Sequence, residues 1–171
     1  VSAVDYLYEA GVVQGGGDGR FRPSEAITRA DFVLMLYRAF DLGSMGGQGS
    51  GFPDVPANSY YAQAVRTAQA LGIATGADDG GFHPTDPVTR QDAAVLLQRT
   101  MQRTGWSLGA GNTNLLSGYS DGWSVASYAQ SAMAIMVEYG IISGTGNGSL
   151  NPRGTTSRAE MAVMLSRAMT L

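Results

Sequence analysis

Three arginines in a shared context are the residues of this 171-residue chain whose type and spacing best support ligand chemistry. Arg29, Arg90 and Arg158 each follow a threonine or serine directly and precede an acidic residue by two positions. The planar guanidinium group binds carboxylates and phosphates through two parallel hydrogen bonds. Each arginine is also expected at the start of a helix, where the helix dipole disfavours a cation by about 0.3 to 1 kcal/mol. This locally unfavourable placement occurs three times, which predicts a negatively charged partner for each arginine.

The sequence leaves two sources open for that partner. The first source is internal, and the candidate acids are Asp31, Asp92, Glu160, Asp54 and Asp121. The second source is an anionic ligand that the guanidinium group would hold together with backbone amides at the helix start. An internal acid that keeps the arginine oriented is compatible with a bound ligand, so both sources can operate at one site.

The hydroxyl residues and acids around each arginine are typical of helix starts. In the segment Thr28-x-x-Asp31, the threonine hydroxyl is expected to accept a hydrogen bond from the amide of Asp31, while the carboxylate favours the positive end of the helix. The equivalent pairs are Thr89 with Asp92 and Ser157 with Glu160. These pairs predict three helix starts and would support any groove beside the arginines.

Each arginine motif belongs to a longer unit that occurs three times. Gly11, Gly72 and Gly140 stand eighteen residues before the three arginines, and each glycine is followed by a large apolar residue at ten positions and a proline at twelve. Apolar residues at helical spacing precede each glycine, which predicts a helix that ends there. A second apolar stripe at helical spacing follows each arginine. Each unit is therefore predicted to be a helix, an ordered loop held by its large apolar residue, and a second helix.

Two connectors of linker composition, 41–51 and 104–117, separate the units. The repeats then span 1–43, 52–104 and 118–171. One helix-loop-helix unit is too small to bury its apolar stripe alone. We therefore expect one all-α module in which three repeats pack together with approximate threefold symmetry.

Composition excludes several classes of partner. The formal net charge of −3 argues against a nucleic-acid-binding surface. The chain has no cysteine, so disulfides and thiolate sites are absent. No apolar run approaches the roughly 20 residues that cross a bilayer, which predicts no membrane insertion. The first residues lack the basic region of a signal peptide, so an export signal would lie outside this sequence.

The residue patterns typical of enzymes and metal sites are missing. His83 is the only histidine, and it takes a loop position that other residues occupy in the other two repeats. Neither H-E-x-x-H nor G-x-S-x-G occurs. The adjacent acids Asp78 and Asp79 lie in a predicted loop and are typical of solvated turns rather than of a glycosidase pair. The sequence thus predicts no catalysis, no cofactor and no metal.

The three units resemble the surface-layer homology (SLH) repeat, which has a Gly-Ile start, a G-x-F-x-P loop and an ITRAE-type helix start. Their sequences are GVVQGGGDGRFRPSEAITRAD, GIATGADDGGFHPTDPVTRQD and GIISGTGNGSLNPRGTTSRAE. The segment 52–65, FPDVPANSYYAQAV, is similar to the F-x-D-V-P beginning of that repeat. The resemblance covers essentially the whole chain as three tandem repeats.

The resemblance implies a wall-anchoring module at the bacterial cell surface, fused to or associated with other surface domains. Such modules form a three-pronged spindle around a central helical bundle. The grooves between prongs bind anionic secondary cell-wall polysaccharide, often through a pyruvylated amino sugar. The arginine of each motif would contact the acidic group of the ligand. Further implied ligand-binding residues are Asp54, Asp121, Tyr60 and Tyr128, the acids as hydroxyl acceptors or groove supports and the tyrosines as ring faces for a sugar.

Some positions depart from the repeat pattern or lie beside it. The first unit lacks an F-x-D-V segment, and Asp121 lies one residue further from its glycine than Asp54 does. Trp106 and Trp123 lie in or beside connectors, where each would either pack onto the core or stack on a sugar. The alternative function is a helical scaffold for a protein partner, which would depend on a broad apolar surface rather than on the arginines.

Overall fold

The computed structural model describes residues 2–14 and 18–171 as a set of helices joined by ordered loops. The α-helices within these residues are α1 (Ala3–Glu9), α2 (Arg29–Ala39), α3 (Ala62–Ala70), α4 (Arg90–Arg103), α5 (Gln130–Glu138) and α6 (Arg158–Met169). The short 3₁₀ helices are η1 (Leu42–Met45), η2 (Thr113–Gly118), η3 (Gly122–Ser124) and η4 (Ser127–Ala129). The described residues form no sheet, only isolated bridges. The all-α prediction is confirmed.

Local sequence signals set the helix ends. Gly11, Gly72 and Gly140 follow α1, α3 and α5 with φ of 74°, 74° and 69°, the left-handed conformation that glycine adopts without steric cost. The hydroxyls that precede α2, α4 and α6 accept hydrogen bonds from the third amide of each helix, as predicted. The three bonds run from Asp31 to Thr28, from Asp92 to Thr89 and from Glu160 to Ser157.

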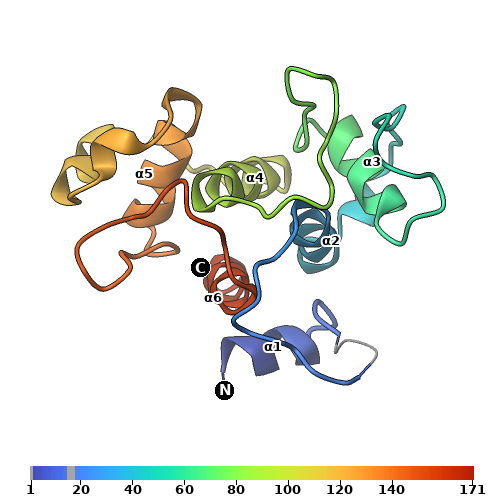
Figure 1. Cartoon of the computed structure of the whole chain (residues 1–171), viewed down its shortest axis with the longest axis horizontal. Helices are drawn as coiled ribbons and strands as arrows, with labels where there is room; N and C mark the ends of the chain where they lie inside the picture. The colour runs from blue at the N-terminus through green and yellow to red at the C-terminus, as the bar shows by residue number, and fades with distance from the viewer. Residues whose placement is uncertain (1, 15–17) are drawn as a thin grey trace.

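The helices are arranged as three prongs around a centre (Figure 1). The second helices of the repeats, α2, α4 and α6, lie in the middle, and the first helices, α1, α3 and α5, lie outside them. Each outer helix packs on the inner helix of the preceding repeat: α3 on α2, α5 on α4, and α1 on α6, which closes the circle. The predicted threefold arrangement around a central helical bundle is confirmed. The ranges 1–43, 52–104 and 118–171 stay a prediction about sequence units, because every prong combines two of them.

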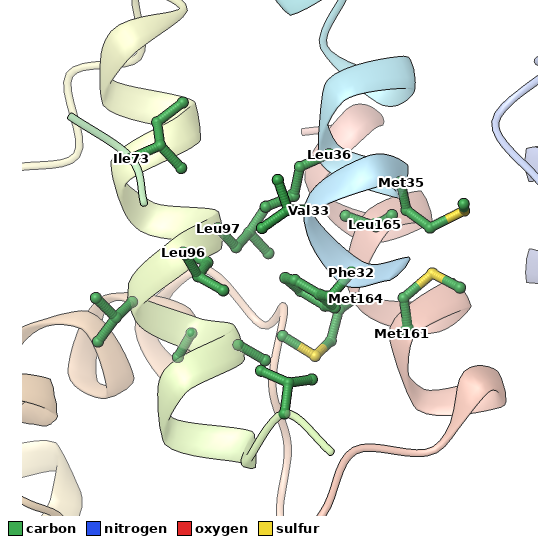
Figure 2. Close-up of a cluster of buried hydrophobic side chains, with 14 of the residues drawn as sticks. Phe32, Val33, Met35, Leu36, Ile73, Leu96, Leu97, Met161, Met164 and Leu165 are labelled. Atoms are coloured by element: carbon green, nitrogen blue, oxygen red, sulfur yellow. The ribbon is translucent and has the colours of Figure 1, made fainter. Parts of the chain in front are cut away.

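Side chains from the three inner helices meet in the central core (Figure 2). Phe32 and Leu36 of α2, Leu97 of α4, and Met161 and Leu165 of α6 are all fully buried. Full burial of such a side chain stabilises the fold by about 1.5 to 3 kcal/mol. A core that draws on all three repeats explains how units too small to fold alone form one module.

A ring of backbone hydrogen bonds joins the repeats just before the inner helices. The amide of Ile27 donates to the carbonyl of Thr156 (2.9 Å), the amide of Thr156 to the carbonyl of Val88 (2.9 Å), and the amide of Val88 to the carbonyl of Ile27 (3.0 Å). All three residues are almost fully buried. The hydroxyl of Thr156 has no hydrogen-bond partner among the described residues. The ring therefore carries one buried polar group where the other two repeats carry an aliphatic side chain.

Replacing Thr156 with valine should raise the free energy of unfolding by about 1 kcal/mol, because a buried hydroxyl without a partner carries a desolvation cost. For a chain of this size, that gain corresponds to an increase in melting temperature of about 2 to 4 °C in thermal unfolding followed by circular dichroism. Thr100→Val is the matched control, since the hydroxyl of Thr100 is equally buried but donates to the carbonyl of Leu96 (2.8 Å). A lower melting temperature for Thr156→Val would contradict the assignment of an unpartnered hydroxyl.

Candidate ligand-binding grooves

The motif arginines, Arg29, Arg90 and Arg158, pair with the acids of the next repeat in a closed cycle. The pairs are Arg29 with Asp92 (3.3 Å), Arg90 with Glu160, and Arg158 with Asp31 (3.9 Å), each between Nη1 and a carboxylate oxygen. The internal partner left open by the sequence is therefore the motif acid of a neighbouring repeat. Such a pair bridges the start of one inner helix to the start of another.

Each motif arginine also binds the loop of that neighbouring repeat. The Nε atoms of Arg29, Arg90 and Arg158 donate to the carbonyls of Phe82 (3.0 Å), Leu150 (2.8 Å) and Phe21 (2.9 Å), respectively. The guanidinium groups of Arg29 and Arg158 lie 5.0 Å from the ring centres of the same phenylalanines, a cation–π geometry. Leu150 provides no such ring, and Arg90 instead makes a further long contact to the carbonyl of Ser143 (3.4 Å).

The backbone amides at the helix starts are occupied, which corrects one hypothesis. The amides of Arg29 and Ala30 donate to the carbonyls of Asp86 (2.9 Å) and Pro84 (3.0 Å) in repeat two. The equivalent bonds run from Arg90 to Gly154, from Gln91 to Pro152, from Arg158 to Glu25 and from Ala159 to Pro23. The next amide of each helix donates to the capping hydroxyl. The hypothesis that these amides hold a ligand anion together with the guanidinium group is therefore wrong.

Tyrosines from the repeat that follows bind two of the three motif acids. The hydroxyl of Tyr60 donates to Asp31 (2.5 Å), and the hydroxyl of Tyr128 donates to Asp92 (2.6 Å). Partial burial of the hydroxyls, together with these bonds to carboxylates, raises the pKa of both Tyr60 and Tyr128 to about 12. The two side chains nevertheless stay 71% and 62% exposed as whole residues, so much of each ring is accessible. Both tyrosines are protonated at neutral pH and present an accessible aromatic surface.

Asp54 and Asp121 hold the loops rather than the arginines. The carboxylate of Asp54 accepts from the amides of Phe82 and His83, both at 2.8 Å. Asp121 accepts in the same way from the amides of Leu150 (2.7 Å) and Asn151 (2.8 Å), so the extra residue before it is absorbed without changing the contact. Although partial burial opposes the shift, the backbone amides hold the pKa of Asp54 below its usual range. Of the two roles implied for these acids, the geometry supports that of groove support.

Three grooves lie between the repeats, one beside each ion pair. Groove A contains Arg158 and Asp31 and has a volume of about 370 Å³. Groove B contains Arg29 and Asp92, with about 650 Å³, and groove C contains Arg90 and Glu160, with about 420 Å³. Tyr60 lines groove A and Tyr128 lines groove B. The arginine, acid and tyrosine of one such groove come from three different repeats.

Each groove contains a second arginine that the sequence analysis missed. Arg38, Arg99 and Arg167 stand nine residues after the motif arginines and line grooves A, B and C, respectively. Each sits on the same helix as the acid of its groove, seven residues further along, which places the two on one helix face. The constant spacing of nine residues from the motif arginines is the sequence signal that marks them.

The two tryptophans lie outside the grooves. Trp106 follows α4 and is 38% exposed, and Trp123 lies in η3 and is 85% exposed. Neither lines groove A, B or C, so a contact with a sugar stays a prediction for both. Across 2–14 and 18–171, no group of three acids or histidines is arranged for a metal ion. No helix in these ranges is long and apolar enough to cross a membrane.

The family of the chain follows from comparison with known proteins. A family model described as S-layer homology domain matches residues 2–33, 51–94 and 118–162, which together are more than half of the chain. The chain belongs to the S-layer homology domain family. Each matched segment contains one motif arginine with its capping hydroxyl and acid, whereas Arg38, Arg99 and Arg167 lie beyond the ends of the matched segments. Family membership identifies the chain as a cell-surface anchoring module and places it at the bacterial cell surface.

Similar proteins include surface-layer proteins and enzymes. The chain is 32% identical to a surface-layer 125 kDa protein of Lysinibacillus sphaericus over 98% of its own length and 14% of that protein. It is 25% identical to an S-layer protein of Bacillus thuringiensis subsp. finitimus over 98% of its length and 20% of that protein. It is 28% identical to an amylopullulanase of Thermoanaerobacterium thermosulfurigenes over 95% of its length and 8% of the enzyme. The chain thus corresponds to a small module of much longer relatives.

Proposed function

We propose that the S-layer homology module anchors a surface protein by holding an anionic secondary cell-wall polysaccharide, such as a pyruvylated one, in the grooves between its repeats. The observation that carries the proposal is the recurrence of one groove type three times. Each groove combines at least two guanidinium groups, at least one carboxylate and residues of a loop. Two of them add an exposed tyrosine ring. These groups match a ligand that carries acidic groups, hydroxyls and the apolar face of a sugar ring.

Repetition of the groove suits a polymer better than a single small molecule. A polysaccharide repeats its acidic sugar along one chain, so a polymer bound in one groove raises the effective concentration of acidic sugar at the other two. Such multivalent binding exceeds the affinity of one groove by about 10² to 10⁴ when the geometry permits simultaneous contact. Modest binding in each groove would then suffice for a stable anchor.

The proposal assigns no catalysis, cofactor or metal to this chain. The amylopullulanase relative shares with it only 8% of the enzyme length, which supports a transferable module that is joined to different surface or enzyme domains. Within the described residues, exposed large apolar side chains number eight and include Tyr60 and Tyr128 of the grooves. The rival function, a scaffold for a protein partner, would need a broader apolar face.

Isothermal titration calorimetry with wall polysaccharide from the organism that encodes the chain tests the proposal. The folded chain should bind the acidic polymer, and affinity should fall as ionic strength rises. The matched ligand control is the same polymer with its carboxyl groups neutralised by chemical reduction, which should bind far more weakly. Equal binding of both polymers would contradict recognition through charge. No binding of the native polymer by the folded chain would contradict the anchoring mechanism and favour a protein partner.

A further inference from the structure

We infer that Asn147, in the loop of repeat three, is a site of spontaneous deamidation, assisted by hydrogen bonds that the loop makes to its side-chain oxygen. In this reaction the backbone nitrogen of Gly148 loses its proton to solvent and attacks the side-chain carbon Cγ of Asn147. The side-chain nitrogen takes up a proton and leaves as ammonia. The cyclic succinimide that remains then adds one water molecule and opens to a carboxylate. The net reaction consumes one water, releases one ammonia and replaces a neutral amide with an acid.

The sequence context favours this reaction at one asparagine. Asn147 is followed by glycine, whereas the other asparagines of the chain precede serine, threonine, leucine or proline. The attack requires a change of backbone conformation and a close approach to Cγ, which glycine permits because it has no Cβ. A side chain on the following residue hinders the approach, most of all a β-branched one, and proline has no N–H to lose. Asn147 therefore has the most reactive neighbour of any asparagine in the chain.

The surroundings of Gly148 leave its nitrogen accessible. Asn147 and Gly148 are both exposed. Gly148 has a φ of 80°, and a Cβ placed on it would meet no heavy atom within 4 Å beyond its chain neighbours. Within residues 2–14 and 18–171 its amide donates to no acceptor, so loss of the proton breaks no hydrogen bond there. Solvent can thus reach the nitrogen that acts as the nucleophile.

The side-chain oxygen of Asn147 already accepts hydrogen bonds that suit the intermediate. The amide of Ser149 donates to Oδ1 (3.2 Å), and so do the hydroxyls of Ser149 (2.6 Å) and Thr145 (2.8 Å). The bond from the amide folds the side chain back over the peptide that follows it. When the nitrogen adds to Cγ, negative charge collects on Oδ1, and donors already directed at that oxygen stabilise it. The loop therefore assists the step that forms the ring.

The equivalent loops of the other two repeats already carry the product. Asp18 and Asp79 stand where repeat three has Asn147, each seven residues after the glycine that ends the outer helix and each followed by glycine. Their Oδ1 atoms accept from the amide two residues later, at 3.1 and 2.9 Å, as the oxygen of Asn147 does. These backbone bonds hold the pKa of both carboxyls below the usual range, so both are ionised at neutral pH and resist attack. An aspartate at position 147 would fit the same turn.

The succinimide can open in two ways, and the products differ in their effect on the loop. Opening at the side-chain carbonyl gives aspartate and restores the original backbone. Opening at the main-chain carbonyl gives isoaspartate, in which the backbone runs through Cβ and is one carbon longer. The carbonyl of Gly148 accepts from the amide of Ser120 (2.9 Å), and the longer backbone would displace this carbonyl. Either product adds one negative charge to the formal net charge of −3.

Incubation of the folded chain in mildly alkaline buffer, followed by peptide mapping with mass spectrometry, tests the inference. The peptide that contains Asn147 should gain about 1 Da, and the modified fraction should grow with time and faster at higher pH, because the nitrogen must lose its proton. Asn112 is the matched internal control, since it is exposed and its Oδ1 also accepts from the amide two residues later (3.1 Å), but Thr113 follows it. Conversion should be at least about tenfold faster at Asn147 than at Asn112. Equal rates at the two asparagines would overturn the inference.

Two variants test the chemistry of the loop. Asn147→Asp should show no gain in mass at this position and should elute from an ion-exchange column with the aspartate product of the aged parent chain. Ser149→Ala keeps the Asn-Gly pair but removes one donor to Oδ1, and circular dichroism checks that the variant folds. Its conversion should be about threefold or more slower than that of the parent. Conversion as fast as that of the parent, or faster, would overturn the assistance assigned to the loop.

Discussion

Replacing Arg90 with methionine should lower the free energy of unfolding by about 3 kcal/mol, more than the same change at Arg29 or Arg158. The side chain of Arg90 is only 9% exposed. Its Nε donates to the carbonyl of Leu150, and its guanidinium group contacts Glu160 and the carbonyl of Ser143. Methionine fills a similar volume but leaves these acceptors without a donor. Removal of one partner from a buried pair costs about 3 to 5 kcal/mol, and the partial exposure of Glu160 places this case near the lower value.

Urea unfolding of the parent chain and the variants measures this difference. Arg29→Met and Arg158→Met should lose about 1 to 2 kcal/mol, because their side chains are 19% exposed and solvent compensates the unpaired groups. Arg103→Met, which alters an exposed arginine, should stay within about 0.5 kcal/mol of the parent. A loss at Arg90 no larger than that at Arg103 would show that the contacts of the motif arginines to the neighbouring repeat do not stabilise the packing of the repeats.

The helix pattern could be predicted from the sequence because its signals are local. A glycine at the left-handed position ends each outer helix, and a hydroxyl residue caps each inner helix, so each boundary depends on a few adjacent residues. The large apolar residue of each loop could be predicted for the same reason. In the structure, Phe82 and Leu150 are nearly fully buried, whereas Phe21 is only partly buried. The recurrence of the pattern three times then indicated one module with threefold symmetry.

The partners of the motif arginines could not be predicted, because they depend on how the repeats pack. The sequence offered Asp31, Asp92 and Glu160 as candidates but contained no local signal for which repeat supplies each acid. The choice follows from the docking of each outer helix on the inner helix of the preceding repeat. The same docking brings the loop carbonyls of Asp86 and Pro84 onto amides of α2, which is why these amides are unavailable to a ligand.

The second arginines show a different kind of omission. Their spacing of nine residues from the motif arginines could be read in the sequence, but spacing alone does not reveal a missing partner. The structure adds that Arg38 and Arg99 are half-buried beside grooves A and B, and that no carboxylate oxygen of the described residues lies within 4.0 Å of either guanidinium group. Partnering, rather than position, distinguishes them from Arg29 and Arg158. The repetition of the charge is visible in the sequence, whereas the position of these arginines in the grooves depends on how the repeats pack.

Replacing Asp54 with alanine should lower the free energy of unfolding by about 2 kcal/mol at neutral pH. The carboxylate binds the amides of Phe82 and His83, and His83 holds a left-handed backbone conformation (φ 59°) that is costly without such support. The effect should also reach groove B, because the carbonyl of Phe82 orients Arg29. Asp78→Ala, which removes an exposed acid from the same loop, is the matched control and should stay within about 0.5 kcal/mol of the parent.

The pH dependence provides a second check on Asp54. Its folded-state pKa lies below its usual range, so the stabilisation is fully present above the unfolded-state pKa of about 3.9 and is lost as pH falls through the lower folded-state value. The difference in unfolding free energy between the parent and Asp54→Ala should therefore be constant from pH 7 to about pH 5 and should shrink in stronger acid. Urea unfolding at several pH values measures this difference. A difference in unfolding free energy that stays constant down to about pH 2 would mean that the loop depends on the size of the Asp54 side chain rather than on its charge. The carboxylate would then no longer explain how the loop positions Arg29.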